Sequence, residues 1–142
     1  ITLAAATLGY VNVPQAPVEA VIALSILFLA TEIIHMLQGK TGLARRYPWL
    51  VAFIFGLLHG FGFAGALSEI GLPQSDIPLA LLFFNVGVEV GQLIFVTGVL
   101  LIGMLLKRLF TQPLRWGEIV ITYVIGSVAA FWTIERVVAF AT

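Results

Sequence analysis

Long apolar stretches alternate with short polar breaks along the chain. A helix needs roughly 20 apolar residues to cross a hydrocarbon core about 30 Å thick, and four stretches meet that length: residues 18–38, 47–70, 77–106 and 117–140. A shorter apolar stretch, residues 1–11, predicts part of a further span. We therefore expect one transmembrane domain over residues 1–142. Its predicted fold class is all-α, a polytopic transmembrane helical bundle with four full spans plus an N-terminal partial span.

The breaks between these stretches contain turn-forming residues and unevenly distributed basic residues. Pro14 and Pro17 precede the first full span, and Pro73 and Pro113 lie in later breaks. Lysine and arginine gather in loops 39–48 and 107–116, while the other two breaks have none. Because basic loops stay on the cytoplasmic side, we expect both of these loops to be cytoplasmic. The expected location is the bacterial inner membrane.

The amino-acid composition argues against several classes of protein and of metal site. Hydrophobic residues make up 61% of the chain and charged residues 10%, against about 45–50% and about 25% in an ordinary soluble domain. The net charge is zero and no basic run occurs, so nothing indicates a nucleic-acid partner. There is no cysteine and there are only two methionines, which argues against thiolate metal sites and a copper(I) path. The expected partners are the lipid bilayer and further transmembrane helices of the same or another chain.

An ionisable side chain inside a span costs about 2.5–3.5 kcal/mol, so it needs a partner, a water-filled cavity or a function. Glu32 and His35 are three residues apart on the first full span, which places them on neighbouring turns of one helix face. They could bind one ion together. Alternatively, a neutral Glu32 could be hydrogen bonded to His35 near the cytoplasmic interface.

His59 is predicted near the middle of the second full span. It lies in a glycine-rich segment, with small residues at Gly56, Gly60, Gly62 and Gly65. At about 100° per residue, Gly56 and Gly62 fall on the same side of the helix as His59, so another backbone can approach closely there. We expect His59 to be a metal ligand and these glycines to serve helix packing. The alternative for His59 is a buried side chain bonded to a backbone carbonyl.

Asn85, Glu89 and Gln92 form a polar stripe on the third full span. Their spacing places them within an arc of about 60° on one helix face. Gly87 and Gly91 lie nearly opposite, where they suit close helix packing. The stripe predicts Glu89 and Asn85 as ligands and Gln92 as a supporting group. Hydrogen bonding between helices is the alternative for the two amides.

Together these groups predict a metal site with nitrogen and oxygen ligands. Imidazole, carboxylate and amide donors suit nickel, cobalt, zinc or iron. We expect His59, Glu89 and Asn85 to form a central site. Glu32 and His35 would form an inner station, a second ion-binding site nearer the cytoplasmic interface. A short connection makes the second and third full spans antiparallel neighbours, so His59 and Glu89 are predicted to face each other within reach of one ion.

Two segments carry a family resemblance. Phe55-Gly-Leu-Leu-His59-Gly-Phe-Gly-Phe-Ala-Gly-Ala-Leu67, followed by Phe84-Asn85-Val-Gly-Val-Glu89-Val-Gly-Gln92, resembles the second subgroup of the HupE/UreJ membrane proteins. The likeness extends over essentially the whole chain and matches the C-terminal part of the family pattern. It implies a polytopic helical protein associated with nickel or cobalt supply. The subgroup also has an upstream motif of histidine and aspartate that this sequence lacks, so we expect the chain to be part of a longer protein.

The predicted function is therefore a membrane permease or metal-handling subunit for a divalent transition metal, with nickel or cobalt ahead of zinc or iron. It is not predicted to be an enzyme. One alternative is a non-catalytic helical subunit of a larger membrane complex. A less supported alternative is an intramembrane metalloenzyme, since Glu32 and His35 have the Glu-x-x-His spacing of di-iron carboxylate bundles. Such bundles need two of these pairs, and this sequence has one.

Overall fold

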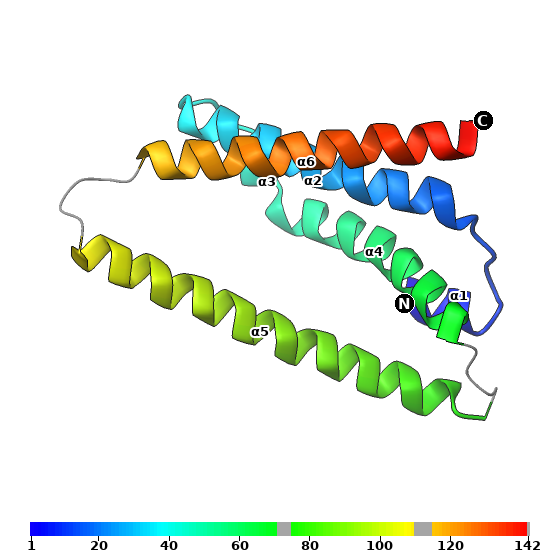
Figure 1. The fold of residues 1–142 in the computed structure, drawn as a ribbon. Coiled ribbons are helices and arrows are strands. Elements are labelled where there is room, and N and C mark those ends of the chain that lie inside the picture. Colours follow the sequence, from blue (N-terminus) through cyan, green and yellow to red (C-terminus); the bar gives the residue numbers. More distant parts are fainter. Residues whose placement is uncertain (71–74, 110–114, 142) are drawn as a thin grey trace. The chain divides into compact units, whose positions relative to one another are not determined.

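The computed structural model describes residues 1–70, 75–109 and 115–141 of the chain (Figure 1). These residues form helices and no strand: α1 (Thr2–Thr7), α2 (Gln15–Leu37), α3 (Leu43–Arg46), α4 (Pro48–Ile70), α5 (Ile77–Leu109) and α6 (Arg115–Ala141). Four of them, α2, α4, α5 and α6, are long and apolar enough to cross a membrane. The predicted all-α membrane fold is confirmed. The predicted breaks at Pro73 and Pro113 lie outside the described residues.

Two helices extend beyond their expected ends for local chemical reasons. α2 begins at Gln15 and includes Pro17 in its first turn, where the missing N–H of proline has no intrahelical partner to lose. α5 continues to Leu109 through Lys107 and Arg108, and cations stabilise the negative end of the helix dipole. α3 is a short helix that the hydropathy pattern does not indicate.

Glycines end two of the helices. Gly9 follows α1 with a φ of 79°, and Gly39 follows α2 with a φ of 80°. The left-handed region that both occupy is accessible to glycine without steric cost. After α2, the N–H of Gly39 donates to the Met36 carbonyl and the N–H of Lys40 to the His35 carbonyl, at 3.0 and 2.9 Å. These bonds close the last turn of α2 and direct the chain toward α3.

The helices fall into two compact units, one formed by α1 to α4 with α6 from Glu118 onward, and one that contains α5. Each unit is described by itself below. The expectation of a single transmembrane domain stays a prediction.

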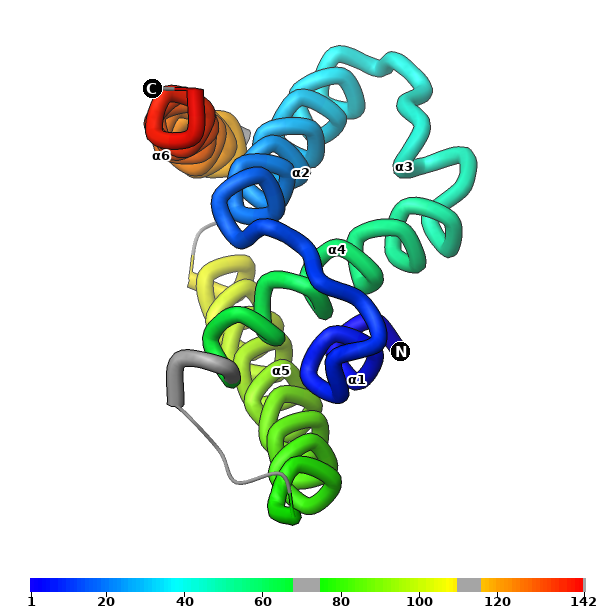
Figure 2. The backbone as a smooth tube through the Cα atoms, turned by 90° about the vertical axis from the view of Figure 1, so that its right-hand side faces the viewer, coloured from blue at the N-terminus to red at the C-terminus, as the bar shows by residue number. Residues whose placement is uncertain are grey.

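In the first unit, α1, α2 and α3 all contact α4. α2 and α4 run antiparallel: the rings of Phe28 and Phe55 meet edge to face at 6.0 Å between centroids, and farther along Gln15 reaches Gly65. α1 lies beside the middle of α4 (Figure 2), where the Thr2 hydroxyl donates to the Leu57 carbonyl at 2.7 Å. α4 is therefore the central helix of this unit.

α6 lies antiparallel to α2 in the same unit. Near the start of α2, Glu19 forms an ion pair with Arg136 at 3.1 Å. Eleven positions farther along α2, Ala30 faces Gly126, where an added Cβ would lie 3.2 Å from the alanine. Ala129, one turn from Gly126, is only 1% exposed. Small residues therefore let α2 and α6 approach closely, as is usual between membrane helices.

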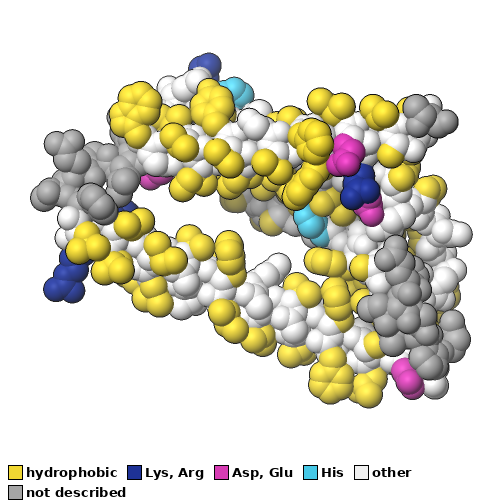
Figure 3. Space-filling view, viewed as in Figure 1, with side chains coloured by type: hydrophobic (Ala, Val, Ile, Leu, Met, Phe, Trp, Pro, Cys, Tyr) yellow, Lys and Arg dark blue, Asp and Glu magenta, His cyan; other side chains and the backbone are white. Residues whose placement is uncertain are grey.

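The outward faces of the helices are apolar. Hydrophobic side chains cover most of the visible helix surface, and charged side chains gather near helix ends (Figure 3). On α6, Phe131 and Trp132 are 63% and 49% exposed. Apolar surface of this extent indicates contact with lipid or with further helices.

Candidate functional site

His59 occupies the middle of α4, eleven residues from either end. Its Nδ1 lies 2.8 Å from the Phe55 carbonyl oxygen, one turn earlier. Because a carbonyl oxygen can only accept, Nδ1 carries the proton in this bond, which leaves Nε2 as the ring nitrogen that could bind a metal. This is the bond that the alternative of a carbonyl-bonded histidine predicts, although His59 is only partly buried. Histidines that bind metals are also commonly held in this way, with the second nitrogen fixed by a backbone carbonyl. The role of His59 as a metal ligand stays a prediction.

A cavity of about 270 Å³ lies beside His59, between α2 and α4. Gln15 and Glu19 of α2 line it together with His59, and the remaining lining residues are Ile22, Gly62, Phe63 and Ala66. The Gln15 amide nitrogen donates to the Gly62 carbonyl at 3.2 Å, so its carbonyl oxygen is the remaining acceptor of that side chain. The cavity therefore has one imidazole, one carboxylate and one amide on its walls.

Glu19 and Gln15 are cavity residues that the sequence analysis missed. The hydropathy pattern places the start of the span at residue 18, which makes Glu19 look like an interface residue. In the structure α2 begins at Gln15, so Glu19 lies one turn inside the helix and next to α4. Glu19 could be identified from the sequence if Pro17 were interpreted as a residue of the first helical turn rather than as the end of a loop, because the helix would then begin before Glu19.

The glycines around His59 differ in their surroundings. Gly60 lies against Thr2 and the Leu3 backbone nitrogen of α1, Gly62 against Ile22, and Gly65 against the Gln15 side chain. Gly56 has no heavy atom within 4 Å of the position that a Cβ would take. The packing role expected for Gly87 and Gly91, on α5, stays a prediction.

Glu32 and His35 lie in different environments near the end of α2. Glu32 is only 7% exposed, and its Oε2 accepts a hydrogen bond of 2.7 Å from the Ala44 N–H in α3. The same carboxylate lies against Gly42, where an added Cβ would have to displace it. His35 is exposed. The structure thus gives Glu32 a partner in the backbone of α3, and the inner station that both residues are expected to form stays a prediction.

The polar stripe of α5 lies in the other unit. Asn85 donates from its amide nitrogen to the Leu81 carbonyl at 2.7 Å, which leaves the amide oxygen as an acceptor. Glu89 and Gln92 follow on the same helix, which continues without a break past Gly87 and Gly91. Because His59 belongs to the first unit, the predicted pairing of His59 with Glu89 stays a prediction.

Within the described residues of the first unit, no three His, Cys, Asp or Glu side chains are grouped so that they could hold a metal ion together. A metal ion beside His59 would therefore take amide, water or further protein ligands in addition to Glu19.

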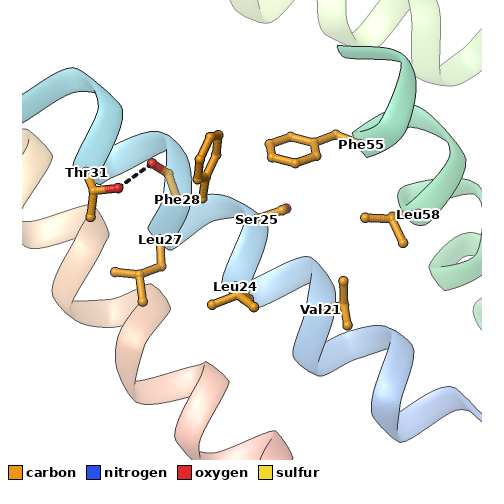
Figure 4. Close-up of a pocket in the computed structure, with 8 residues that line it drawn as sticks. All are labelled: Val21, Leu24, Ser25, Leu27, Phe28, Thr31, Phe55 and Leu58. Atoms are coloured by element: carbon orange, nitrogen blue, oxygen red, sulfur yellow. Dashed lines mark hydrogen bonds between the residues drawn. The ribbon is translucent and has the colours of Figure 1, made fainter. Parts of the chain in front are cut away.

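A second cavity in the same unit, of about 480 Å³, has a different chemistry. Phe55 and Leu58 of α4 line it opposite several α2 side chains, Val21, Leu24, Ser25, Leu27, Phe28 and Thr31 (Figure 4). Its two hydroxyls donate within α2, from Ser25 to the Ile22 carbonyl and from Thr31 to the Phe28 carbonyl, both at 2.7 Å. With no ionisable group on its walls, this cavity does not suit a metal ion.

Comparison with known families supplies the assignment. The HupE / UreJ protein family matches residues 1–136, which include both the His59 and the Glu89 segments. The chain belongs to the HupE/UreJ family. This family is associated with nickel and cobalt transport, which supports a metal-handling membrane protein rather than an enzyme. Comparison of this HupE/UreJ chain with curated proteins and with solved structures gives no match.

Proposed function

We propose that this chain is a membrane permease or metal-handling subunit for a divalent transition metal ion, with nickel or cobalt ahead of zinc or iron. The observation that carries the proposal is the state of His59. Its Nδ1–H is held by the Phe55 carbonyl, so Nε2 is a nitrogen donor beside a cavity that also has a carboxylate and an amide on its walls. Nitrogen and oxygen donors of this kind suit nickel and cobalt.

In the proposed central site, His59 acts together with Glu89 and Asn85 of α5, and Gln92 orients Glu89. The Asn85 amide oxygen is the group with which that residue would bind, because its nitrogen already donates to Leu81. Glu32 and His35 form the proposed inner station, nearer the basic loop 39–48. An ion that moves between two such stations needs sites that bind moderately and exchange readily.

The proposed orientation places loops 39–48 and 107–116 in the cytoplasm, with the protein in the bacterial inner membrane. The basic residues of these loops support it. The proposed partners are lipid and further transmembrane helices. The exposed aromatic and aliphatic side chains of α6 support this proposal, because they provide an apolar surface for such contacts.

Metal titration of the purified full-length protein tests this function, and the chain's two histidines provide a matched pair of variants. Nickel, cobalt and zinc binding would be measured by calorimetry for the wild type, His59→Gln and His35→Gln. We expect His59→Gln to weaken nickel or cobalt binding by about 10- to 100-fold or more, because loss of a group that only orients a ligand already costs about that much, and His35→Gln to have a smaller effect. Absence of binding in the wild type, or equal binding in wild type and His59→Gln, would overturn the proposal.

A further inference from the structure

The cavity beside His59 contains a carboxylate that the proposed central site does not use. Glu19 lines this cavity, and its Oε2 lies 3.1 Å from the Arg136 guanidinium of α6. We propose that Glu19 is a second ligand of the transported cation and that Arg136 is its exchangeable counter-ion. Arg136 holds Glu19 before the metal arrives, and a divalent ion that binds between Glu19 and His59 displaces it. This inference rests on the proposed function and adds Glu19 to the ligands that act with His59.

The donors around the cavity match such an ion. His59 offers Nε2, Glu19 offers carboxylate oxygens, and Gln15 offers the amide oxygen that remains while its nitrogen donates to Gly62. One imidazole with oxygen donors suits nickel, cobalt or zinc, and water completes the coordination. Six waters at about 30 Å³ each occupy roughly 180 Å³. The cavity of about 270 Å³ therefore has room for a partly hydrated ion.

The ion pair has the properties of a contact that can exchange. The side chains are 50% exposed for Arg136 and 34% for Glu19, and exposed ion pairs contribute little to stability. A divalent ion attracts a carboxylate about twice as strongly as a single charge at the same distance. Arginine keeps its proton in proteins, so it leaves a carboxylate by moving away rather than by becoming neutral.

The position of Arg136 gives the released guanidinium a polar environment. It lies five residues before the end of α6, and long basic side chains near helix ends extend readily into the headgroup region. Release of the guanidinium therefore exposes it to water and lipid headgroups rather than to hydrocarbon.

A purely structural ion pair that fastens α6 to α2 is the competing explanation, and the two differ in the sign of a mutational effect. If Arg136 competes with the metal, Glu19→Gln weakens nickel or cobalt binding while Arg136→Gln strengthens it. If the pair is only structural, both variants disturb the same contact and change metal binding in the same direction or leave it unchanged.

The test is a nickel and cobalt titration of the full-length protein and its variants in detergent. We expect about 10- to 100-fold weaker binding in Glu19→Gln, about two- to fivefold tighter binding in Arg136→Gln, and the Glu19→Gln value in the double variant. Glu118→Gln and Arg45→Gln remove the same charges elsewhere and should match the wild type. If the first variants do not yield folded protein, Arg136→Leu replaces Arg136→Gln and Glu19→Leu replaces Glu19→Gln, because both also remove the charge and keep the expected directions.

The experiment distinguishes failure of the proposed function from failure of the Glu19 inference. If the wild type binds neither metal, the proposed function falls and the inference falls with it. If the wild type binds metal through His59 but Glu19→Gln binds equally well, or Arg136→Gln weakens binding as Glu19→Gln does, the exchange at Glu19 is wrong while the proposed function stands.

Discussion

Glu32 shows how one side chain can satisfy a structural need at a position that also suits a ligand. A carboxylate within an apolar span is costly unless it is paired. Its Oε2 accepts the Ala44 N–H, which is one of the backbone donors left without a partner at the start of a helix. α3 has four residues, too few to be stable by itself. The buried carboxylate of Glu32 therefore stabilises the connection between α2 and α4.

This role makes a prediction for stability. Glu32→Ala should lower the free energy of unfolding by about 1–3 kcal/mol, because the Ala44 N–H loses its partner at a buried position. Glu32→Gln should lower the free energy of unfolding much less, since the amide oxygen can still accept the hydrogen bond from the Ala44 N–H. Unfolding in detergent, followed by circular dichroism, measures both, with the exposed His35→Ala as the control. A loss in Glu32→Gln as large as that in Glu32→Ala would contradict the hydrogen-bond explanation.

At the scale of the helix, the glycine-rich segment of α4 combines positions that need glycine with one that does not. A Cβ at Gly60 would meet the Thr2 side chain and would lie 3.1 Å from the Leu3 backbone nitrogen. The same atom at Gly56 would have no neighbour within 4 Å. α1 therefore depends on Gly60 for its contact with α4, whereas Gly56 tolerates a methyl group in this unit.

Two alanine substitutions on the same helix test this difference. Gly60→Ala should destabilise the protein by about 1–3 kcal/mol, as overpacking does. Gly56→Ala should be neutral or stabilising by up to about 1 kcal/mol, because alanine is the better helix former. Thermal unfolding of the two variants beside the wild type provides the comparison. Equal stability of the two variants would show that the contact between α1 and α4 does not depend on Gly60.

The helices could be predicted from the sequence because the thickness of the bilayer sets the length of an apolar span. Features that depend on contacts between distant residues could not. α3 is held by Glu32, twelve residues before its partner Ala44, and no hydropathy pattern records that bond. The contact of Glu19 with Arg136 joins residues near opposite ends of the chain, so the sequence does not indicate it. His59 could be found, since an ionisable residue in the middle of a span needs an explanation by itself.

At the scale of the whole molecule, the account depends on a metal ion held by His59. The first unit supplies the imidazole, Glu19 and Gln15 beside one cavity. α5 supplies the proposed oxygen ligands Glu89 and Asn85. A site built in this way has a single imidazole among oxygen donors, which differs from a site with both histidines or with none.

X-ray absorption spectroscopy of the nickel-loaded full-length protein tests this claim most directly, because scattering from an imidazole ring is distinguishable from that of oxygen ligands. At no more than one nickel per chain, we predict one imidazole with the remaining ligands oxygen, loss of most of the imidazole signal in His59→Gln, and a smaller change in His35→Gln, because His35 belongs to the proposed inner station and not to the central site. A spectrum without imidazole, or one that His59→Gln leaves unchanged, would contradict the account.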